Sequence, residues 1–78
     1  MSKISNLDPY QELANAIVLQ AVKDYRDVNK KLARSRKNRA AQEVHDECLR
    51  FFRSKRFSLL TEVDPEFLIR RLDEEVNE

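Results

Sequence analysis

The 78-residue chain contains no glycine, although average usage of about 7% would give roughly five. Phosphate-binding loops of the GxGxxG and Walker A types need glycine, because their backbone adopts positive φ or lets a phosphate approach closely. The single cysteine excludes an internal disulfide, and together with the single histidine it is too little for a zinc site. We therefore expect no nucleotide loop, no disulfide scaffold and no cofactor.

Long apolar runs are also missing. No stretch of 18 apolar residues exists, and residues 1–11 lack the apolar core of a signal peptide, so we expect neither membrane insertion nor secretion but a reducing cytoplasm. Apolar residues make up 41% of the chain, which is enough for one small core. Chains of this size bury only about 60% of their unfolded surface and often need a partner subunit. We predict a single helical domain over residues 1–78, with residues 1–7 flexible.

The apolar residues that are present follow the spacing of amphipathic helices. A first helix is predicted over 9–33, because Asp8 can cap it, Pro9 suits its first position, and apolar residues then recur at steps of three and four. Additional apolar residues widen the stripe in its first half, so we expect that half to be buried on more than one side. The stripe comprises Tyr10, Leu13, Ala14, Ile17, Ala21, Tyr25, Val28 and Leu32, and the additional residues are Ala16, Val18, Leu19 and Val22.

Two further helices complete the prediction. Asn38 is a candidate N-cap for a second helix over 39–53, which would pack antiparallel on the first. Asp64 and Pro65 repeat the earlier start signal for a third helix over 65–76. Between these helices, Phe57, Leu59 and Leu60 are expected to anchor a short helical turn. The predicted fold class is all-α: a three-helix protein with a long αα-hairpin, a C-terminal helix and a short helical turn.

Charge is unevenly distributed behind a net charge of +1. Residues 23–56 hold twelve basic and five acidic side chains, whereas residues 57–78 hold two basic and seven acidic ones. The candidate binding residues are Lys30, Lys31, Arg34, Arg36, Lys37, Arg39, Arg50, Arg53, Lys55 and Arg56. They would neutralise nucleic-acid phosphates, dock an acidic protein, or stay solvated and pair within the chain, for example Arg39 with Glu43 and Arg70 with Glu66. We favour the solvated, self-paired interpretation.

Residues able to do chemistry are few. His45 and Cys48 are three apart and could face each other on the second helix, but no third orienting group or oxyanion donor is identifiable. We therefore expect His45 at the core boundary, Cys48 in the core, and no catalysis. Phe51, Phe52 and Phe57 interleave with basic residues, but their helical spacing favours a core role over base stacking.

Part of the sequence resembles a group of short uncharacterised proteins carried by phages and prophages of Gram-positive, gut-type bacteria. The resemblance lies in ELANAIVLQAVKDYR at 12–26, RFFRSKRFSLL at 50–60, Thr61, Asp64 and FLIRRL at 67–72, and it leaves residues 29–47 unconstrained. It implies a phage accessory protein inside the bacterial host cell, with no defined activity. We expect a non-enzymatic protein that binds another protein or itself, or alternatively nucleic acid, with no membrane and no small-molecule substrate.

Overall fold

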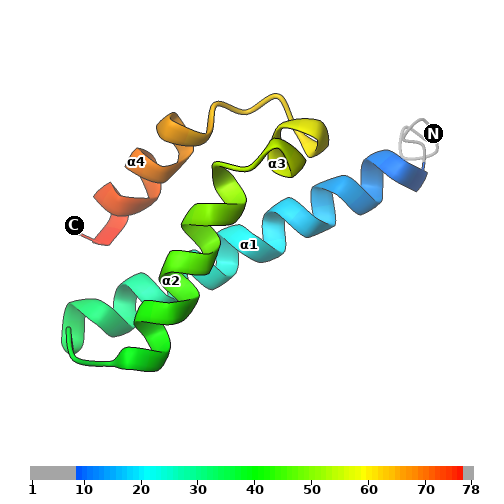
Figure 1. Ribbon diagram of the computed structural model, residues 1–78. Helices are drawn as coiled ribbons and strands as arrows, with labels where there is room; N and C mark the ends of the chain where they lie inside the picture. The colour runs from blue at the N-terminus through cyan, green and yellow to red at the C-terminus, as the bar shows by residue number, and fades with distance from the viewer. Residues whose placement is uncertain (1–8, 77–78) are drawn as a thin grey trace, which may run out of the picture.

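The computed structural model describes residues 9–76, and every regular element in that range is an α-helix (Figure 1). The predicted all-α class and its long hairpin are confirmed, and the predicted helical turn is a short helix in its own right. The roles expected for residues 1–7 and for Asp8 lie outside the described residues. The helices are α1, Pro9–Arg34; α2, Arg39–Phe52; α3, Lys55–Leu60; and α4, Pro65–Val76.

Polar side chains begin three of these helices. The Asn38 side chain accepts a hydrogen bond of 3.0 Å from the backbone N–H of Ala41 at the start of α2. Ser54 accepts one of 3.2 Å from the N–H of Phe57 at the start of α3. Asp64 accepts one of 3.1 Å from the N–H of Glu66 at the start of α4. Such caps satisfy N–H groups that lack helical partners, and no described residue needs positive φ, so these turns close without glycine.

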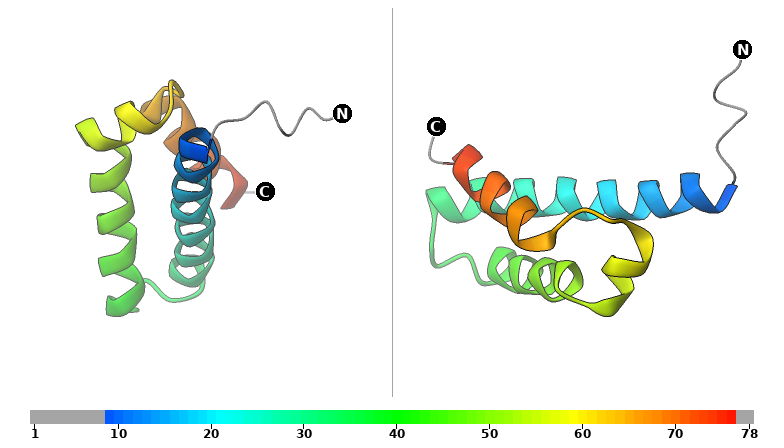
Figure 2. Two further views of the ribbon diagram at one scale, coloured as in Figure 1. Left: turned by 90° about the vertical axis from the view of Figure 1, so that its right-hand side faces the viewer. Right: turned by 90° about the horizontal axis from the view of Figure 1, so that it is seen from above.

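The hairpin is formed by α2 running back along the second half of α1 (Figure 2). The ring of Tyr25 lies 5.2 Å from that of His45 and 5.6 Å from that of Phe52. Farther along, Cys48 Sγ lies 3.9 Å from the carbonyl oxygen of Ala21. From His45 to Cys48 along α2, the contact on α1 moves back from Tyr25 to Ala21. The two helices are therefore antiparallel, as the apolar spacing predicted.

The last helix, α4, returns toward the hairpin tip and lies beside the second half of α1 (Figures 1 and 2). Its Asp73 accepts hydrogen bonds from the Tyr25 hydroxyl at 2.7 Å and from Asn29 Nδ2 at 3.3 Å. The acidic helix thus packs on the hairpin beside its basic segment, a placement that the helix predictions had left open.

Phenylalanine rings form the centre of the core. Phe52 and Phe57 are fully buried, with ring centroids 5.6 Å apart in an edge-to-face contact, and Phe51 packs against them. This confirms the core role predicted for the three rings. The anchoring role predicted for Leu59 is wrong, because its side chain is 80% exposed. Two residues after Phe57, it points about 200° away around the short helix. The buried cluster comprises Val22, Tyr25, Cys48, Phe52, Phe57, Ile69 and Leu72.

The first half of α1 extends beyond the end of α2, although α3 contacts α1 and Val18 packs against the core. With 26 residues α1 is about 39 Å long, whereas the 14 residues of α2 reach only about 21 Å. The burial expected for this half is therefore wrong: Tyr10 is 83% exposed and Leu13 59%. We call residues 9–20 the α1 projection (Figure 1). Although α1 is long, none of the described helices is apolar enough over a sufficient length to cross a bilayer.

Candidate binding surfaces

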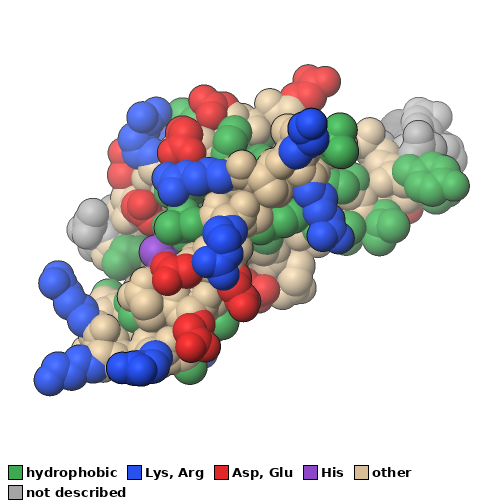
Figure 3. Space-filling model, in the orientation of Figure 1, with side chains coloured by type: hydrophobic (Ala, Val, Ile, Leu, Met, Phe, Trp, Pro, Cys, Tyr) green, Lys and Arg blue, Asp and Glu red, His purple; other side chains and the backbone are tan. Residues whose placement is uncertain are grey.

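The ten basic candidate residues fall into two groups at opposite ends of α2. One group surrounds the hairpin turn, and the other lies where α2 meets α3. The length of α2 separates them by about 20 Å, so they form two surfaces and not one. Figure 3 shows Lys and Arg side chains at the hairpin tip, apart from those nearer α3. The tip group is Lys30, Lys31, Arg34, Arg36, Lys37 and Arg39, and the distal group is Arg50, Arg53, Lys55 and Arg56.

The tip group carries positive charge that the described chain leaves largely unbalanced. Lys31 pairs with Asp27 one turn earlier, at 3.0 Å. Within residues 9–76, no acidic side chain forms an ion pair with the other members of the group, which include the exposed Arg36 and Lys37. The pair predicted between Arg39 and Glu43 is accordingly not formed. The tip is an exposed cationic surface.

The distal group is partly neutralised by α4. Arg53 donates two hydrogen bonds to the carboxylate of Glu66, of 2.8 and 3.1 Å, and these bonds lower the pKa of Glu66. This overturns the prediction that Glu66 pairs with Arg70. The Arg70 guanidinium lies 5.8 Å from the centroid of the Phe67 ring instead. The planar guanidinium of Arg53, the residue that follows α2, holds both carboxylate oxygens of Glu66, because α4 folds back and brings Glu66 to it.

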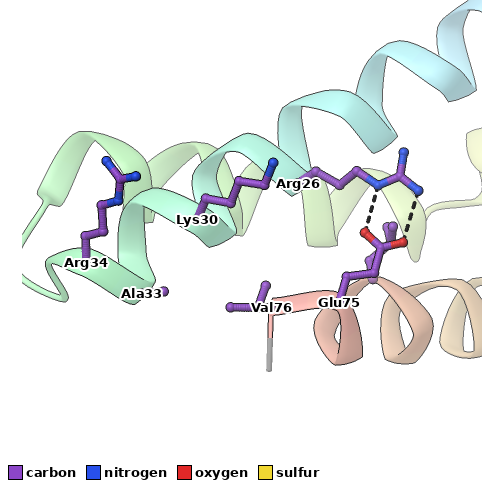
Figure 4. Close-up of a pocket in the computed structure, with 7 residues that line it drawn as sticks. Arg26, Lys30, Ala33, Arg34, Glu75 and Val76 are labelled. Carbon is purple, nitrogen blue, oxygen red and sulfur yellow. Dashed lines mark hydrogen bonds and ion pairs between the residues drawn. The ribbon is translucent and has the colours of Figure 1, made fainter. Parts of the chain in front are cut away.

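A second bidentate ion pair fastens the other end of α4 to α1. Arg26 donates two hydrogen bonds to Glu75, of 2.9 and 3.1 Å, and they lower the pKa of this carboxyl group (Figure 4). Beside the pair lies a cleft of about 330 Å³, with Leu72 and Val76 among its apolar lining residues. Lys30 extends from α1 at the same cleft, without a hydrogen bond to Glu75 (Figure 4). Glu75 therefore neutralises the charge of Arg26, whereas most charges of the tip group have no acidic partner among the described residues.

A buried phenol is the most perturbed titratable group in the described chain. Tyr25 is 1% exposed, and burial raises its pKa well above the usual value, as does its hydrogen bond to Asp73. The hydroxyl therefore stays protonated and serves as a donor that links α1 to α4. Sequence reasoning missed this contact and that of Asn29, because the shared acceptor lies more than 40 residues away and no local pattern marks it.

His45 and Cys48 do not form a nucleophile–base pair. His45 Nδ1 lies 3.2 Å from Asp46, and its half-buried ring stacks on Tyr25. Cys48 is buried, and desolvation raises the pKa of its thiol, which disfavours the reactive thiolate. The boundary and core positions predicted for the two residues are confirmed. Among residues 9–76, no group of three or more His, Cys, Asp and Glu side chains is placed to hold a metal ion.

The α1 projection exposes an apolar stripe on a stretch with very little charge. Tyr10, Leu13 and Ile17 are 83%, 59% and 38% exposed, and their steps of three and four place them on one face. Leu19, 60% exposed, lies on the other side of the helix. The only charged residue of the projection is Glu12. Figure 3 shows hydrophobic side chains at this end of the molecule.

The fold and its surfaces define a small all-α protein built on a helical hairpin, with a cationic tip at one end and an apolar projection at the other. Comparison of the chain with protein-family models, with curated proteins and with solved structures finds no match. A function is therefore inferred from the physical properties of these surfaces.

Proposed function

We propose that the protein is not an enzyme and acts by binding another protein through the α1 projection. The observation that carries the proposal is the exposure of Tyr10, Leu13 and Ile17 along one face of a helix. Single exposed apolar residues are common on protein surfaces, but a contiguous apolar stripe is typical of an interaction site. An amphipathic helix of this kind binds an apolar groove or another helix through anchors at i, i+3 and i+7.

The small number of charges supports an apolar protein partner. Charged residues make up 37% of the whole chain, yet Glu12 is the only one among the twelve residues of the projection. A phosphate backbone or an acidic protein would find no cationic side chain on this segment. An apolar protein surface would bury the stripe without leaving buried charges unpaired.

Site-specific photo-crosslinking in cells of the natural host tests this proposal. A benzophenone amino acid at position 13 should form a covalent adduct with one protein, and Ile17→Glu in the same chain should abolish the adduct because a charge would then enter the interface. The matched control carries the probe in place of Glu43, which is exposed on α2. Equal labelling from positions 13 and 43, or no adduct from position 13, would refute the proposal.

Nucleic-acid binding through the tip group is the second candidate function. It is favoured by the absence of acidic partners for Arg34, Arg36, Lys37 and Arg39 within residues 9–76. Each phosphate contact contributes about 0.9 to the slope of log affinity against log salt, so four contacts give a slope of about −3.6 on duplex DNA. The slope is measured by fluorescence anisotropy between 20 and 200 mM salt, conditions typical of such a titration.

Two triple variants separate the tip from general positive charge. Changing Arg36, Lys37 and Arg39 together to Ala should reduce DNA affinity. It should also make the slope of log affinity against log salt shallower, by the contribution of about three phosphate contacts. The matched change removes three charges from the distal group, Arg50, Lys55 and Arg56, and should leave most of the affinity intact. Equal losses in the two variants, or no binding at 20 mM salt, would remove this function.

The biological setting we propose is that of a phage accessory protein in the cytoplasm of the bacterial host. This part of the proposal is supported by the resemblance of residues 12–26, 50–61, 64 and 67–72 to phage-borne proteins. The genes beside the coding sequence test it: phage replication, packaging or anti-defence genes are expected. A position among housekeeping genes, without phage genes nearby, would contradict it.

A further inference from the structure

The apolar stripe of the α1 projection continues the stripe with which α1 already binds a helix. Ala21 contacts Cys48 of α2, and Val28 is buried one heptad later, at 4% exposure. Ile17 lies four residues before Ala21, and Leu13 four before that, so all of them share one helix face. Over the second half of α1 this face is covered by α2, whereas over the projection the described residues leave Tyr10, Leu13 and Ile17 exposed. The surface is therefore shaped for another helix.

The projection is complementary to itself. Leu13 and Ala14 stand midway between Tyr10 and Ile17, so two antiparallel copies would place Tyr10 of each chain against Ile17 of the other. The small side chain of Ala14 gives the Leu13 side chain of the second copy a recess at the centre. A two-fold interface requires this kind of self-complementary patch.

Charge also favours a second copy over a foreign partner of marked charge. The stretch from Pro9 to Val22 has Glu12 as its only charged residue, and this side chain points about 100° away from Leu13 around the helix. Two copies would therefore meet along this stripe without like charges facing each other. A strongly acidic or basic partner would gain no ion pair here.

We infer that the partner of the α1 projection is a second copy of this chain, bound antiparallel around a two-fold axis near Leu13 and Ala14. This inference rests on the protein-binding function proposed above. The exposed parts of Tyr10, Leu13 and Ile17 amount to about 300 Å² of apolar surface per chain. A stable interface of standard size buries about 800 Å² per partner. The dimer is therefore weak and reversible, and it forms in the micromolar to millimolar range.

Sedimentation velocity over a range of concentrations tests the dimer with a closely matched pair of variants. The weight-average mass of the unmodified chain should rise toward twice the monomer mass between about 5 μM and 1 mM. Leu13→Glu should weaken association by at least about 30-fold, because it places two carboxylates at the axis. Leu19→Glu should change association less than threefold, although Leu19 is as exposed as Leu13, at 60% against 59%. Because both leucines are exposed, the two variants should unfold at similar temperatures.

Disulfide cross-linking tests the orientation of the helices. Cys48 is buried and stays in place as an internal control. An antiparallel pair brings position 10 of one chain near position 17 of the other, so mixing Tyr10→Cys with Ile17→Cys should give the mixed dimer on mild oxidation. Each variant alone should cross-link poorly, because identical positions other than those at the axis lie far apart.

The outcomes separate this inference from the proposed function. A constant monomer mass up to 1 mM, equal losses from the Leu13 and Leu19 variants, or stronger self-linking of Tyr10→Cys than mixed linking would overturn the antiparallel dimer. If the chain is a strict monomer while the probe at position 13 labels a different protein in cells, the second copy is wrong and the protein-binding function stands. If the probe labels nothing, both fail.

Discussion

The hydrogen bond between Tyr25 and Asp73 leads to a sharp prediction about how α4 is held on the hairpin. Tyr25→Phe removes one oxygen and leaves the ring, whose contacts with His45 and Phe52 remain possible. A hydrogen bond to a charged acceptor contributes about 1.5 to 3 kcal/mol, and the lower end applies here because Asp73 is exposed and can bind water instead. We expect a loss of about 1.5 kcal/mol in the free energy of unfolding, which lowers the Tm by about 6 to 12 °C in a domain of this size.

A double-mutant cycle isolates the bond from the rest of the packing. Asp73→Ala should lower the free energy of unfolding by about 2 to 3 kcal/mol, which is more than Tyr25→Phe does, because it leaves a buried phenol and the Asn29 amide without their acceptor. The double variant should be about 1 kcal/mol more stable than the sum of the single losses implies. Urea unfolding followed by circular dichroism gives all four free energies. A coupling below about 0.3 kcal/mol would refute the bond as a link between α1 and α4.

The same residue predicts a dependence on alkaline pH. Burial and Asp73 raise the pKa of Tyr25 in the folded chain, whereas in the unfolded chain it is about 10. Above pH 10 the unfolded chain therefore loses a proton that the folded chain keeps, so stability falls as the pH rises. The stability advantage of the unmodified chain over Tyr25→Phe should be present at pH 8 and narrow at pH 11. An advantage that grows with pH would show that the phenol ionises in the folded chain.

Three further predictions follow from the core and the ion pairs. Phe52→Ala should cost about 3 to 5 kcal/mol, close to the whole stability expected for a chain this small, and should abolish cooperative thermal unfolding where Phe52→Leu retains it. Cys48 should resist a thiol reagent in the native chain and react at once in denaturant; rapid native labelling would contradict its burial. Arg53 and Arg26 lower the pKa values of Glu66 and Glu75 in the folded chain. The stabilising effect of these two carboxylates is therefore present above the normal glutamate pKa and is lost as the pH falls through the lowered values. When both glutamates are changed to Gln, the urea midpoints of unfolding at pH 7 and pH 3 should differ less than in the unmodified chain.

Local signals explain why the helices were predictable. Pro9, Asn38 and Pro65 each begin a helix at the position where the sequence predicts it, because capping and the fixed φ of proline act over a few neighbouring residues. For the same reason, the apolar stripe of the first helix predicted that Tyr25 lies in the core, and the spacing along the second helix predicted the same for Phe52. Spacing of three and four along a helix is a property of the chain alone, provided that something covers the stripe.

What covers each stripe was decided only by the tertiary structure. Leu13, Ile17, Ala21 and Val28 follow one another at steps of four, four and seven, which place them on one helix face, yet α2 is too short to reach Leu13 and Ile17. The sequence pattern therefore predicted burial for a surface that the folded chain leaves exposed. The predicted ranges 9–33 and 39–53 already contained this difference in helix length, but periodicity alone does not show which part of a stripe another element covers.

The ion pairs were likewise a result of tertiary structure. Glu66 has Arg70 one turn away on its own helix, and local spacing favours that pair. Folding α4 back onto the hairpin brings Arg53 to the same carboxylate with two hydrogen bonds, and Arg26 to Glu75 in the same way. The sequence by itself determined an all-α chain with separated basic and acidic segments. The tertiary structure decided which charges are neutralised, because partners far apart in the chain meet only when the helices pack.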